Sequence, residues 1–410
     1  MVTTSPFIWA VTLLALHPHG CLGYPTMTKE VQLSASERTH VLERIAPEFD
    51  RCGSEIVDVH LHDAFWFDSA APLLAEMDAS FISKAIMLAV YGPVAGPFGG
   101  DPNEVVEEIA KESEGRIFGL ASLNTTVPDW KEQGEAELER LSTFLAKPNF
   151  VGTKLAPPHT CMALNSDIMR DIVHTVSISP SPLVFIHMGT TPFCGPMGAA
   201  ILGTSGCCGP EYVNPTYMED LIQEYPNTNF VLVHAGADFL TPADEYYYDG
   251  TLVDKSLDLA AIYDNVFLEI SAFLREDANH TDAYPGGAAI LRKIADAGLA
   301  SKTVYGSDVN QVPNAMAFYL STTVEKLIGV GFTEEERCMI LSENTMRIFG
   351  FDAAATQHQI QADAPNETET DGAVDEEASD NDTTSSARSL CVLANVVFAS
   401  VLMVSATALA

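Results

Sequence analysis

Basic residues are scarce in this chain: 21 Lys and Arg stand against 56 Asp and Glu among its 410 residues. The formal net charge at pH 7 is therefore -35, and the isoelectric point is near 4.4. A protein of this charge repels the phosphates of nucleic acids and the headgroups of anionic lipids. The composition thus argues against nucleic acid as a partner.

Both ends of the chain also lack basic residues, and both resemble processing signals. Residues 1–23 contain an apolar run, PFIWAVTLLAL, that is too short to span a bilayer, followed by small residues at Cys21 and Gly23 that suit a signal-peptide cleavage site. Residues 389–410 form an uncharged apolar tail that runs to the last residue of the sequence with no basic stop-transfer flank after it, and small residues precede it. This order is typical of a glycosylphosphatidylinositol (GPI) anchor signal, with a permanent transmembrane helix as the alternative.

The segment before this tail, residues 352–388, is acidic and has almost no large apolar side chain. It cannot bury enough apolar surface to fold, so we expect a disordered stalk. N-glycosylation sequons favour passage through the secretory pathway, and we predict that the protein resides on the extracellular face of the plasma membrane. The sequons begin at Asn124, Asn279, Asn366 and Asn381.

Cysteine is scarce too, and no CxxC pair is matched by a second pair, which argues against a cysteine zinc site. Without Cys21 and Cys391, which lie in the terminal signals, an even number remains in an oxidising compartment, so disulfides are expected. Vicinal cysteines seldom bond each other. We therefore hypothesise that Cys161 and three loop cysteines form two bridges, and that Cys52 joins Cys338. The three loop cysteines are Cys194, Cys207 and Cys208.

Hydrophobic residues make up 47% of the chain, enough for one large core, and many occur in short, nearly continuous runs. Such runs are typical of parallel strands buried on both faces. Eight of them follow in order, at 55–62, 84–90, 116–123, 150–156, 182–188, 229–235, 265–271 and 302–308. Helical patterns separate them, for example at 101–115, 129–147 and 284–299. This alternation predicts a (β/α)8 TIM barrel over residues 51–350.

Ligand-type side chains occur where the predicted strands end. His60 and His62 lie one residue apart on the first strand, so both imidazoles face the same side and can bind one metal ion. A lone histidine at a strand end is usually structural. Several on one rim of a barrel indicate a metal site, because buried polar groups are costly without partners. The other strand ends contribute Lys154, His187, His234 and Asp308. The remaining histidines, which fall in the signal, loops, helices or stalk, are His17, His19, His40, His159, His174, His280 and His358.

The strand motifs resemble those of the amidohydrolase superfamily. They are VDVHLHD, VGTKLAPP, VFIHMGTTP, VLVHAG and YGSD, on the first, fourth, fifth, sixth and eighth strands. The similarity is to the amidohydrolase-related branch, which includes aminocarboxymuconate semialdehyde decarboxylase, and it extends from Glu55 to Phe351. The resemblance implies an enzyme with one divalent metal ion, expected to be zinc, with manganese as the alternative.

The resemblance also implies roles for individual residues. The implied metal ligands are His60, His62 and His187. Asp308 would complete the site and orient or deprotonate a bound water, and His234 would act on the substrate as an acid or electrostatic partner. The chemistry of these residue types agrees, because neutral imidazoles suit zinc and a carboxylate beside a metal-activated water can transfer a proton.

Two cations could recognise an acidic substrate. Lys154 could hold a substrate carboxylate or form a structural pair with an aspartate, while a modified lysine bridging two metals is a third alternative. Arg275 follows the seventh strand and could clamp a carboxylate, or it could be an ordinary surface residue beside Glu276 and Asp277. The long Gly-, Pro- and Cys-rich loop 189–215 suggests a lid or binding loop.

Three functions are consistent with these features. The first is hydrolysis of a small carboxylic ester, lactone or amide by a metal-activated water, which the predicted secretion favours. The second is nonoxidative decarboxylation of a small unsaturated or aromatic carboxylic acid, which uses the same ligand set. The third is a surface binding protein that has kept the barrel but lost the chemistry, although the complete set of polar site residues argues against it.

Overall fold

The computed structural model describes residues 34–62, 69–90, 101–127, 129–191, 207, 209–237, 251–271, 286–308 and 315–351. The predicted signal peptide, acidic stalk and anchor signal lie outside these residues, as does Arg275. Within the described part of the chain, no helix is both long enough and apolar enough to cross a membrane.

Eight parallel strands form one sheet in which each strand pairs with the next along the chain. Each of the eight predicted runs contains one strand, so these predictions are confirmed. The strands are β1 (Val57–Leu61), β2 (Lys84–Leu88), β3 (Ile117–Ala121), β4 (Phe150–Leu155), β5 (Leu183–His187), β6 (Asn229–Val233), β7 (Val266–Ile270) and β8 (Thr303–Tyr305).

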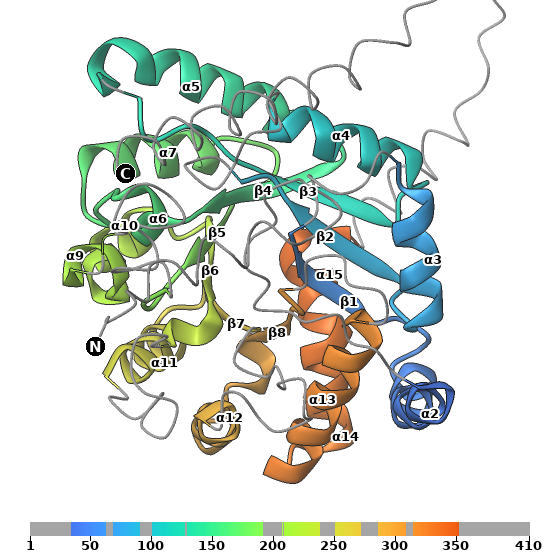
Figure 1. The fold of residues 1–410 in the computed structure, drawn as a ribbon. Helices are drawn as coiled ribbons and strands as arrows, with labels where there is room; N and C mark the ends of the chain where they lie inside the picture. The colour runs from blue at the N-terminus through green and yellow to red at the C-terminus, as the bar shows by residue number, and fades with distance from the viewer. Residues whose placement is uncertain are drawn as a thin grey trace, which may run out of the picture. The chain divides into compact units, whose positions relative to one another are not determined.

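Hydrogen bonds join the chain after β8 to β1 and bring the two edges of the sheet together. The backbone N–H of Asp308, just after β8, donates to the carbonyl of His60 on β1 at 2.9 Å. The N–H of Ser307 donates to the Asp58 carboxylate at 2.9 Å. With helices outside and strands inside (Figure 1), the predicted (β/α)8 barrel is confirmed. The closure also brings the first and last strands together at the end where chemistry gathers in such barrels.

Helices surround the strands, and the predicted helical stretches 101–115, 129–147 and 284–299 contain α4, α5 and α12. The α-helices are α2 (Ala35–Arg51), α3 (Ala71–Ala79), α4 (Pro102–Glu112), α5 (Trp130–Leu145), α6 (Pro157–Thr160), α7 (Asp167–Ser177), α9 (Pro210–Val213), α10 (Glu219–Glu224), α11 (Thr251–Ile262), α12 (Gly286–Asp296), α13 (Ala315–Val330), α14 (Glu334–Cys338) and α15 (Asn344–Phe349). The 3-10 helices are η2 (Pro215–Met218), η3 (His234–Gly236) and η4 (Ala300–Lys302), and η5 (Met339–Glu343) is a π-helix between α14 and α15.

The core lies on both faces of the strands. Every residue of β5 and β7 is buried, as expected for strands with side chains inside the barrel and under the helices. Phe349 and Phe351, at the end of the described chain, belong to the same apolar cluster as Val57 of β1 and Val304 of β8. The last helix therefore packs against the first and last strands.

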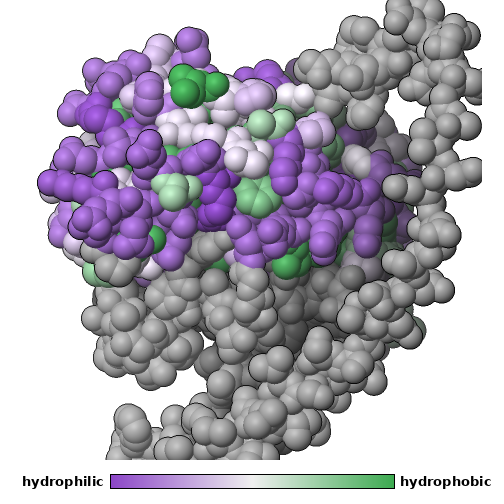
Figure 2. Space-filling model, turned by 90° about the horizontal axis from the view of Figure 1, so that it is seen from above, coloured by the Kyte–Doolittle hydropathy of each residue, from purple (hydrophilic) through white to green (hydrophobic). Residues whose placement is uncertain are grey.

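Exposed large hydrophobic side chains are few in the described part of the chain and belong to different elements. Among the coloured residues of the face drawn in Figure 2, hydrophilic residues predominate and hydrophobic residues lie apart from one another. Single exposed hydrophobic residues of this kind are ordinary on a protein surface. The exposed large hydrophobic residues are Ile178, Tyr217, Ile262 and Ile328.

Helix α2 precedes the first strand and was not anticipated from the sequence. It begins with a capping box, in which the Ser34 side chain accepts from the N–H of Glu37 and the Glu37 side chain accepts from the N–H of Ser34. Its buried Glu48 accepts two hydrogen bonds from Arg337 of α14, at 2.9 and 3.1 Å. The predicted disulfide between Cys52 and Cys338 is present beside this pair. The N-terminal helix is thus joined to the end of the barrel by charge and by a covalent bond.

The second disulfide joins Cys161 to Cys207, with their Cα atoms 5.1 Å apart. It links the segment after β4 to the segment after β5, as hypothesised for the mouth of the barrel. The other proposed partners, Cys194 and Cys208, lie outside the described residues.

Removing the bridge between Cys52 and Cys338 is expected to lower the free energy of unfolding by about 2–5 kcal/mol. The bridge spans 286 residues, so its loss restores a large chain entropy to the unfolded state. Denaturant titration of the Cys52→Ser, Cys338→Ser variant measures the change. The Cys161→Ser, Cys207→Ser variant, whose bridge spans 46 residues, should lose less. An equal or larger loss in this second variant would contradict the entropic explanation.

Candidate metal centre

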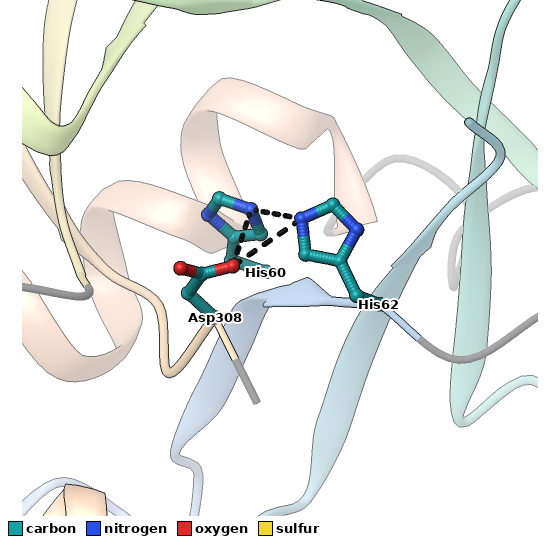
Figure 3. Close-up of side chains that lie close together, drawn as sticks. All are labelled: His60, His62 and Asp308. Atoms are coloured by element: carbon teal, nitrogen blue, oxygen red, sulfur yellow. Dashed lines mark hydrogen bonds and ion pairs between the residues drawn. The ribbon is translucent and has the colours of Figure 1, made fainter. Parts of the chain in front are cut away.

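The end of β1 and the turn after β8 bring three ligand-type side chains together. The Nε2 atoms of His60 and His62 lie 3.0 Å apart. The Asp308 Oδ1 lies 3.4 Å from the His60 Nε2 and 3.3 Å from the His62 Nε2. Figure 3 shows the two rings and the carboxylate pointing toward one another. The spacing of His60 and His62 on one strand therefore has the predicted consequence, and the barrel closure supplies the third side chain.

The geometry of this group fits a single divalent metal ion. Zinc takes nitrogen and oxygen ligands at about 2.0–2.2 Å in a tetrahedron, which places neighbouring ligand atoms about 3.3–3.6 Å apart. The three distances between the ligand atoms of His60, His62 and Asp308 are close to these values. Among the described residues, these three form the group whose ligand atoms all lie within 4.8 Å of one another. The donor set is one that binds zinc or manganese.

His187 and His234 lie beside this group without belonging to it. The His234 ring centroid is 5.5 Å from that of His60 and 4.6 Å from that of His187. The Nε2 of His187 is buried and has no hydrogen-bond partner within the described structure. Burial lowers the pKa of His187 well below its usual value and that of His234 to about 3, so both rings are neutral at physiological pH. A neutral imidazole with an unsatisfied nitrogen suits a metal or a substrate.

A buried carboxylate on β7 connects two of these histidines. Glu269 Oε1 lies 3.2 Å from the Nδ1 of His60, and Glu269 Oε2 accepts the backbone N–H of His234 at 3.0 Å. Ser271 Oγ donates to Glu269 Oε2 at 2.9 Å and lies 3.2 Å from His60 Nδ1 and 3.0 Å from His234 Nδ1. Burial raises the pKa of Glu269, while the His234 ring and N–H and the Ser271 hydroxyl oppose this shift.

These contacts indicate which ring nitrogens carry hydrogen. Because the Ser271 hydroxyl donates to Glu269, its oxygen is left to accept from the Nδ1–H groups of both His60 and His234. The Nε2 of each ring then keeps its lone pair. A hydrogen bond from Nδ1 to a carboxylate fixes the orientation of a metal-binding imidazole and increases its basicity. Glu269 and Ser271 thus fix the orientation of the His60 ring and keep the lone pair on its Nε2, the atom that would bind a metal.

The backbone around His234 also fixes its position. His234 and Ala235 have φ values of 59° and 50°, in the left-handed region that few residues other than glycine adopt. Asp308 has a φ of 55°. Unusual backbone conformations that the surrounding structure maintains are often found at functional sites. Here two of the predicted catalytic residues have them.

Asp58 forms hydrogen bonds with the backbone on both sides of the candidate metal site. It is fully buried on β1, and its Oδ1 accepts the N–H of His60 at 3.1 Å and that of Ser307 at 2.9 Å. Burial raises its pKa to about 7. These bonds tie the end of β1 to the turn that carries Asp308.

Lys154 lies on β4 and is buried. Its Nζ stands 4.9 Å from the centre of the Phe185 ring, a cation–π contact. No acidic side chain in the described residues lies within ion-pair distance of it, so the structural pair with an aspartate considered above is not formed there. Burial lowers its pKa to about 8, and attraction to Glu269 and Asp308 opposes this shift.

The sequence placed His159 among the histidines of the signal, loops, helices or stalk, not among the site residues, and it does lie on a helix. It lies on α6, just after β4, with its ring 4.9 Å from the His187 ring. Its Nε2 is 3.0 Å from the Thr191 Oγ1, and burial lowers its pKa to about 3. Its place soon after a strand end was the signal that could have identified it. For Glu269, the signal was a charged residue inside an otherwise apolar strand.

A protein-family model described as "Amidohydrolase" matches residues 57–351, from β1 to the second residue after α15. The fold and the histidine–aspartate group agree with this match, and the chain belongs to the amidohydrolase family, whose members are metal-dependent enzymes. No curated protein sequence matches the chain.

Several solved structures are similar to this one. A probable 2-pyrone-4,6-dicarboxylic acid hydrolase from Acinetobacter baumannii, with citric acid bound, is 16% identical with a TM-score of 0.45, and the match covers 72% of this chain and 99% of that chain. A 5-carboxyvanillate decarboxylase from Novosphingobium aromaticivorans, complexed with manganese, is 15% identical with a TM-score of 0.45, covering 68% of this chain and 79% of that chain. An organophosphorus hydrolase from Deinococcus radiodurans is 14% identical with a TM-score of 0.40, and the match covers 72% of this chain and 92% of that chain.

Proposed function

We propose that this protein is a metal-dependent hydrolase of a small carboxylic ester, lactone or amide. The observation that carries the proposal is the group formed by His60, His62 and Asp308, whose ligand atoms already have the spacing of a metal site. Zinc is the expected ion and manganese the alternative. Membership of the amidohydrolase family supports hydrolysis as the reaction class.

We assign metal binding to His60, His62 and Asp308, and proton transfer to Asp308. A divalent ion held by His60, His62 and Asp308 would lower the pKa of a coordinated water toward neutrality and polarise the substrate carbonyl. Asp308 accepts the proton of the attacking water and then delivers it to the departing oxygen or nitrogen. The net reaction adds one water across the acyl bond.

His187 and His234 form the neighbouring wall of the site. We assign His187 as a further ligand for the ion or for a substrate oxygen, because its Nε2 is buried without a partner in the described structure. His234 is neutral, and Ser271 faces its Nδ1, so it offers Nε2 as a hydrogen-bond acceptor to the substrate or the attacking water.

Metal content is the first test. The purified chain is expected to hold about one zinc or manganese ion, measured by elemental mass spectrometry, and the His60→Ala, His62→Ala variant should hold none. A folded wild-type chain that takes up no metal even from added zinc would overturn the enzyme proposal and favour the binding-protein hypothesis.

Isotopes from solvent distinguish hydrolysis from decarboxylation, which could use the same residues. In ¹⁸O-labelled water, hydrolysis places one ¹⁸O atom in the carboxylate product. In D₂O, decarboxylation places one deuterium on the carbon that lost carbon dioxide. Esters, lactones, amides and aromatic acids are screened with the metal-loaded chain. Deuterium on carbon, without ¹⁸O in the product, would overturn hydrolysis in favour of decarboxylation.

A further inference from the structure

Lys154 is a buried cation with no acidic partner in the described structure. Its residue is only 4% exposed, and neither a hydrogen bond nor an ion pair to a described residue involves its Nζ. A charge in a protein interior without a direct ion pair or hydrogen bond is costly, so such groups are retained mainly where something else uses them. The contact with the Phe185 ring compensates only part of this cost.

The position of Lys154 places it inside the catalytic site rather than under it. β4 pairs with β5, and Lys154 stands opposite Phe185 in the register of that pair. Phe185 lies two residues before His187 on β5, so their side chains point to the same face of the strand. Its charge acts on His159, His187 and His234, and it is attracted to Glu269 and Asp308. The metal group comes from β1 and β8, whereas Lys154 comes from the fourth strand of the ring. A ligand that reaches both would extend across the mouth of the barrel.

We propose that Lys154 binds a carboxylate of the substrate, on the side of the barrel away from the reacting group. This inference rests on the proposed hydrolase function and names its substrate class: an ester, lactone or amide that carries a second, ionised carboxyl group. A single ammonium beside an aromatic ring suits a singly charged carboxylate, whereas a phosphate calls for several donors. In a chain with a formal charge of -35, an anionic substrate requires a local cation of this kind.

The neighbouring contacts support a rigid anion subsite. His159 of α6 lies within hydrogen-bond distance of Thr191, and the bridge between Cys161 and Cys207 ties the segment after β4 to the segment after β5. The N–H of Cys207 donates to the carbonyl of Pro158 at 2.9 Å. These links hold the wall beside Lys154 in place, so little ordering is needed when the carboxylate binds.

The test uses probes with a metal-binding group at one end. The monohydroxamates of succinic, glutaric and adipic acid have a free carboxylate at increasing distances from the hydroxamate, and each is paired with its neutral terminal amide. Isothermal titration to the metal-loaded chain gives the dissociation constants. For at least one length, the wild-type chain is expected to bind the carboxylate form at least about 10-fold more tightly than the amide.

Variants assign this preference to one side chain. Lys154→Met should abolish it without weakening the amide probes, and Lys154→Arg should keep most of it. Lys302→Met is the matched control, because the Lys302 Nζ also stands 4.9 Å from an aromatic ring, that of Phe267 on β7. Since Lys154→Met removes a buried charge, its melting temperature should equal or exceed that of the wild type.

Three results would overturn the proposal: no carboxylate preference at any length, a preference that persists in Lys154→Met, or loss of bound metal from Lys154→Met. The last would make the lysine part of the metal site instead. If the chain binds no metal, benzoate and benzamide replace the probe pairs. A benzoate preference that Lys154→Met removes would then support the anion subsite while the hydrolase proposal fails.

Discussion

Replacing Asp308 with Asn is expected to lower kcat/KM by about 10²–10⁴-fold, the range that a positioned general base contributes. The Asp308 Oδ1 lies 3.3–3.4 Å from the Nε2 atoms of His60 and His62, so a water activated by an ion held there would be within reach of this carboxylate. Asparagine keeps the shape of the side chain but has neither its charge nor its basicity. The measurement is steady-state kinetics on the substrate found by the screen, together with metal content.

Two controls separate proton transfer from metal binding in this variant. Asp254→Asn changes an exposed aspartate of α11 that pairs with Lys293, and it should leave kcat/KM unchanged. Raising the zinc concentration should not restore Asp308→Asn. Full recovery in excess zinc would show that Asp308 acts only as a ligand, and the assignment as base would be wrong.

Replacing Glu269 with Gln is expected to weaken metal binding by about 10–100-fold, although Glu269 does not touch the ion site itself. The glutamine side chain has one acceptor, its oxygen, and one donor group, its NH₂, whereas both oxygens of the glutamate carboxylate accept hydrogen bonds. If the amide oxygen keeps the backbone N–H of His234, its NH₂ faces the Nδ1 of His60. That ring must then carry its hydrogen on Nε2, where it cannot bind a metal.

The opposite orientation of the glutamine amide places its NH₂ against the His234 N–H and leaves a buried donor unsatisfied. Both orientations of the amide are therefore unfavourable. Competition with a chromogenic chelator measures the metal dissociation constant. Ser271→Ala removes one of the two acceptors near His60 Nδ1 and should give a smaller change in the same direction. Glu48→Gln alters a buried carboxylate remote from the site and should leave metal affinity intact. Equal metal affinity in Glu269→Gln and the wild type would refute the role of Glu269.

The strands could be predicted because parallel strands buried on both faces need continuous apolar runs, and a run as short as that of β5 is more typical of a strand than of a buried helix. The pairing of His60 with His62 followed from the two-residue period of a strand. Asp308 followed from the rule that chemistry gathers at the carboxyl ends of barrel strands. Strand periodicity and barrel topology were therefore enough to predict the fold and the three side chains at the centre of the site.

What could not be predicted depends on contacts between distant parts of the chain. Glu269 is separated from His60 by 209 residues, and only the closed barrel shows that it faces the Nδ1 of that ring. The place of His159 depends on the path of α6 after β4, which strand periodicity does not encode. Helix α2 precedes the first strand, outside the repeating pattern of strands and helices that predicted the domain.

The bond between Cys52 and Cys338 also changes how the protein responds to cutting and to force. Every loop from residue 53 to residue 337 lies inside the covalent ring that it closes. A protease that cuts once in any of these loops leaves both fragments attached, with all eight strands still on one molecule. Tension applied to the chain before Cys52 and after Cys338 passes through the sulfur atoms and bypasses the barrel. The strands that position the metal centre are thereby shielded from mechanical load on either end of the chain.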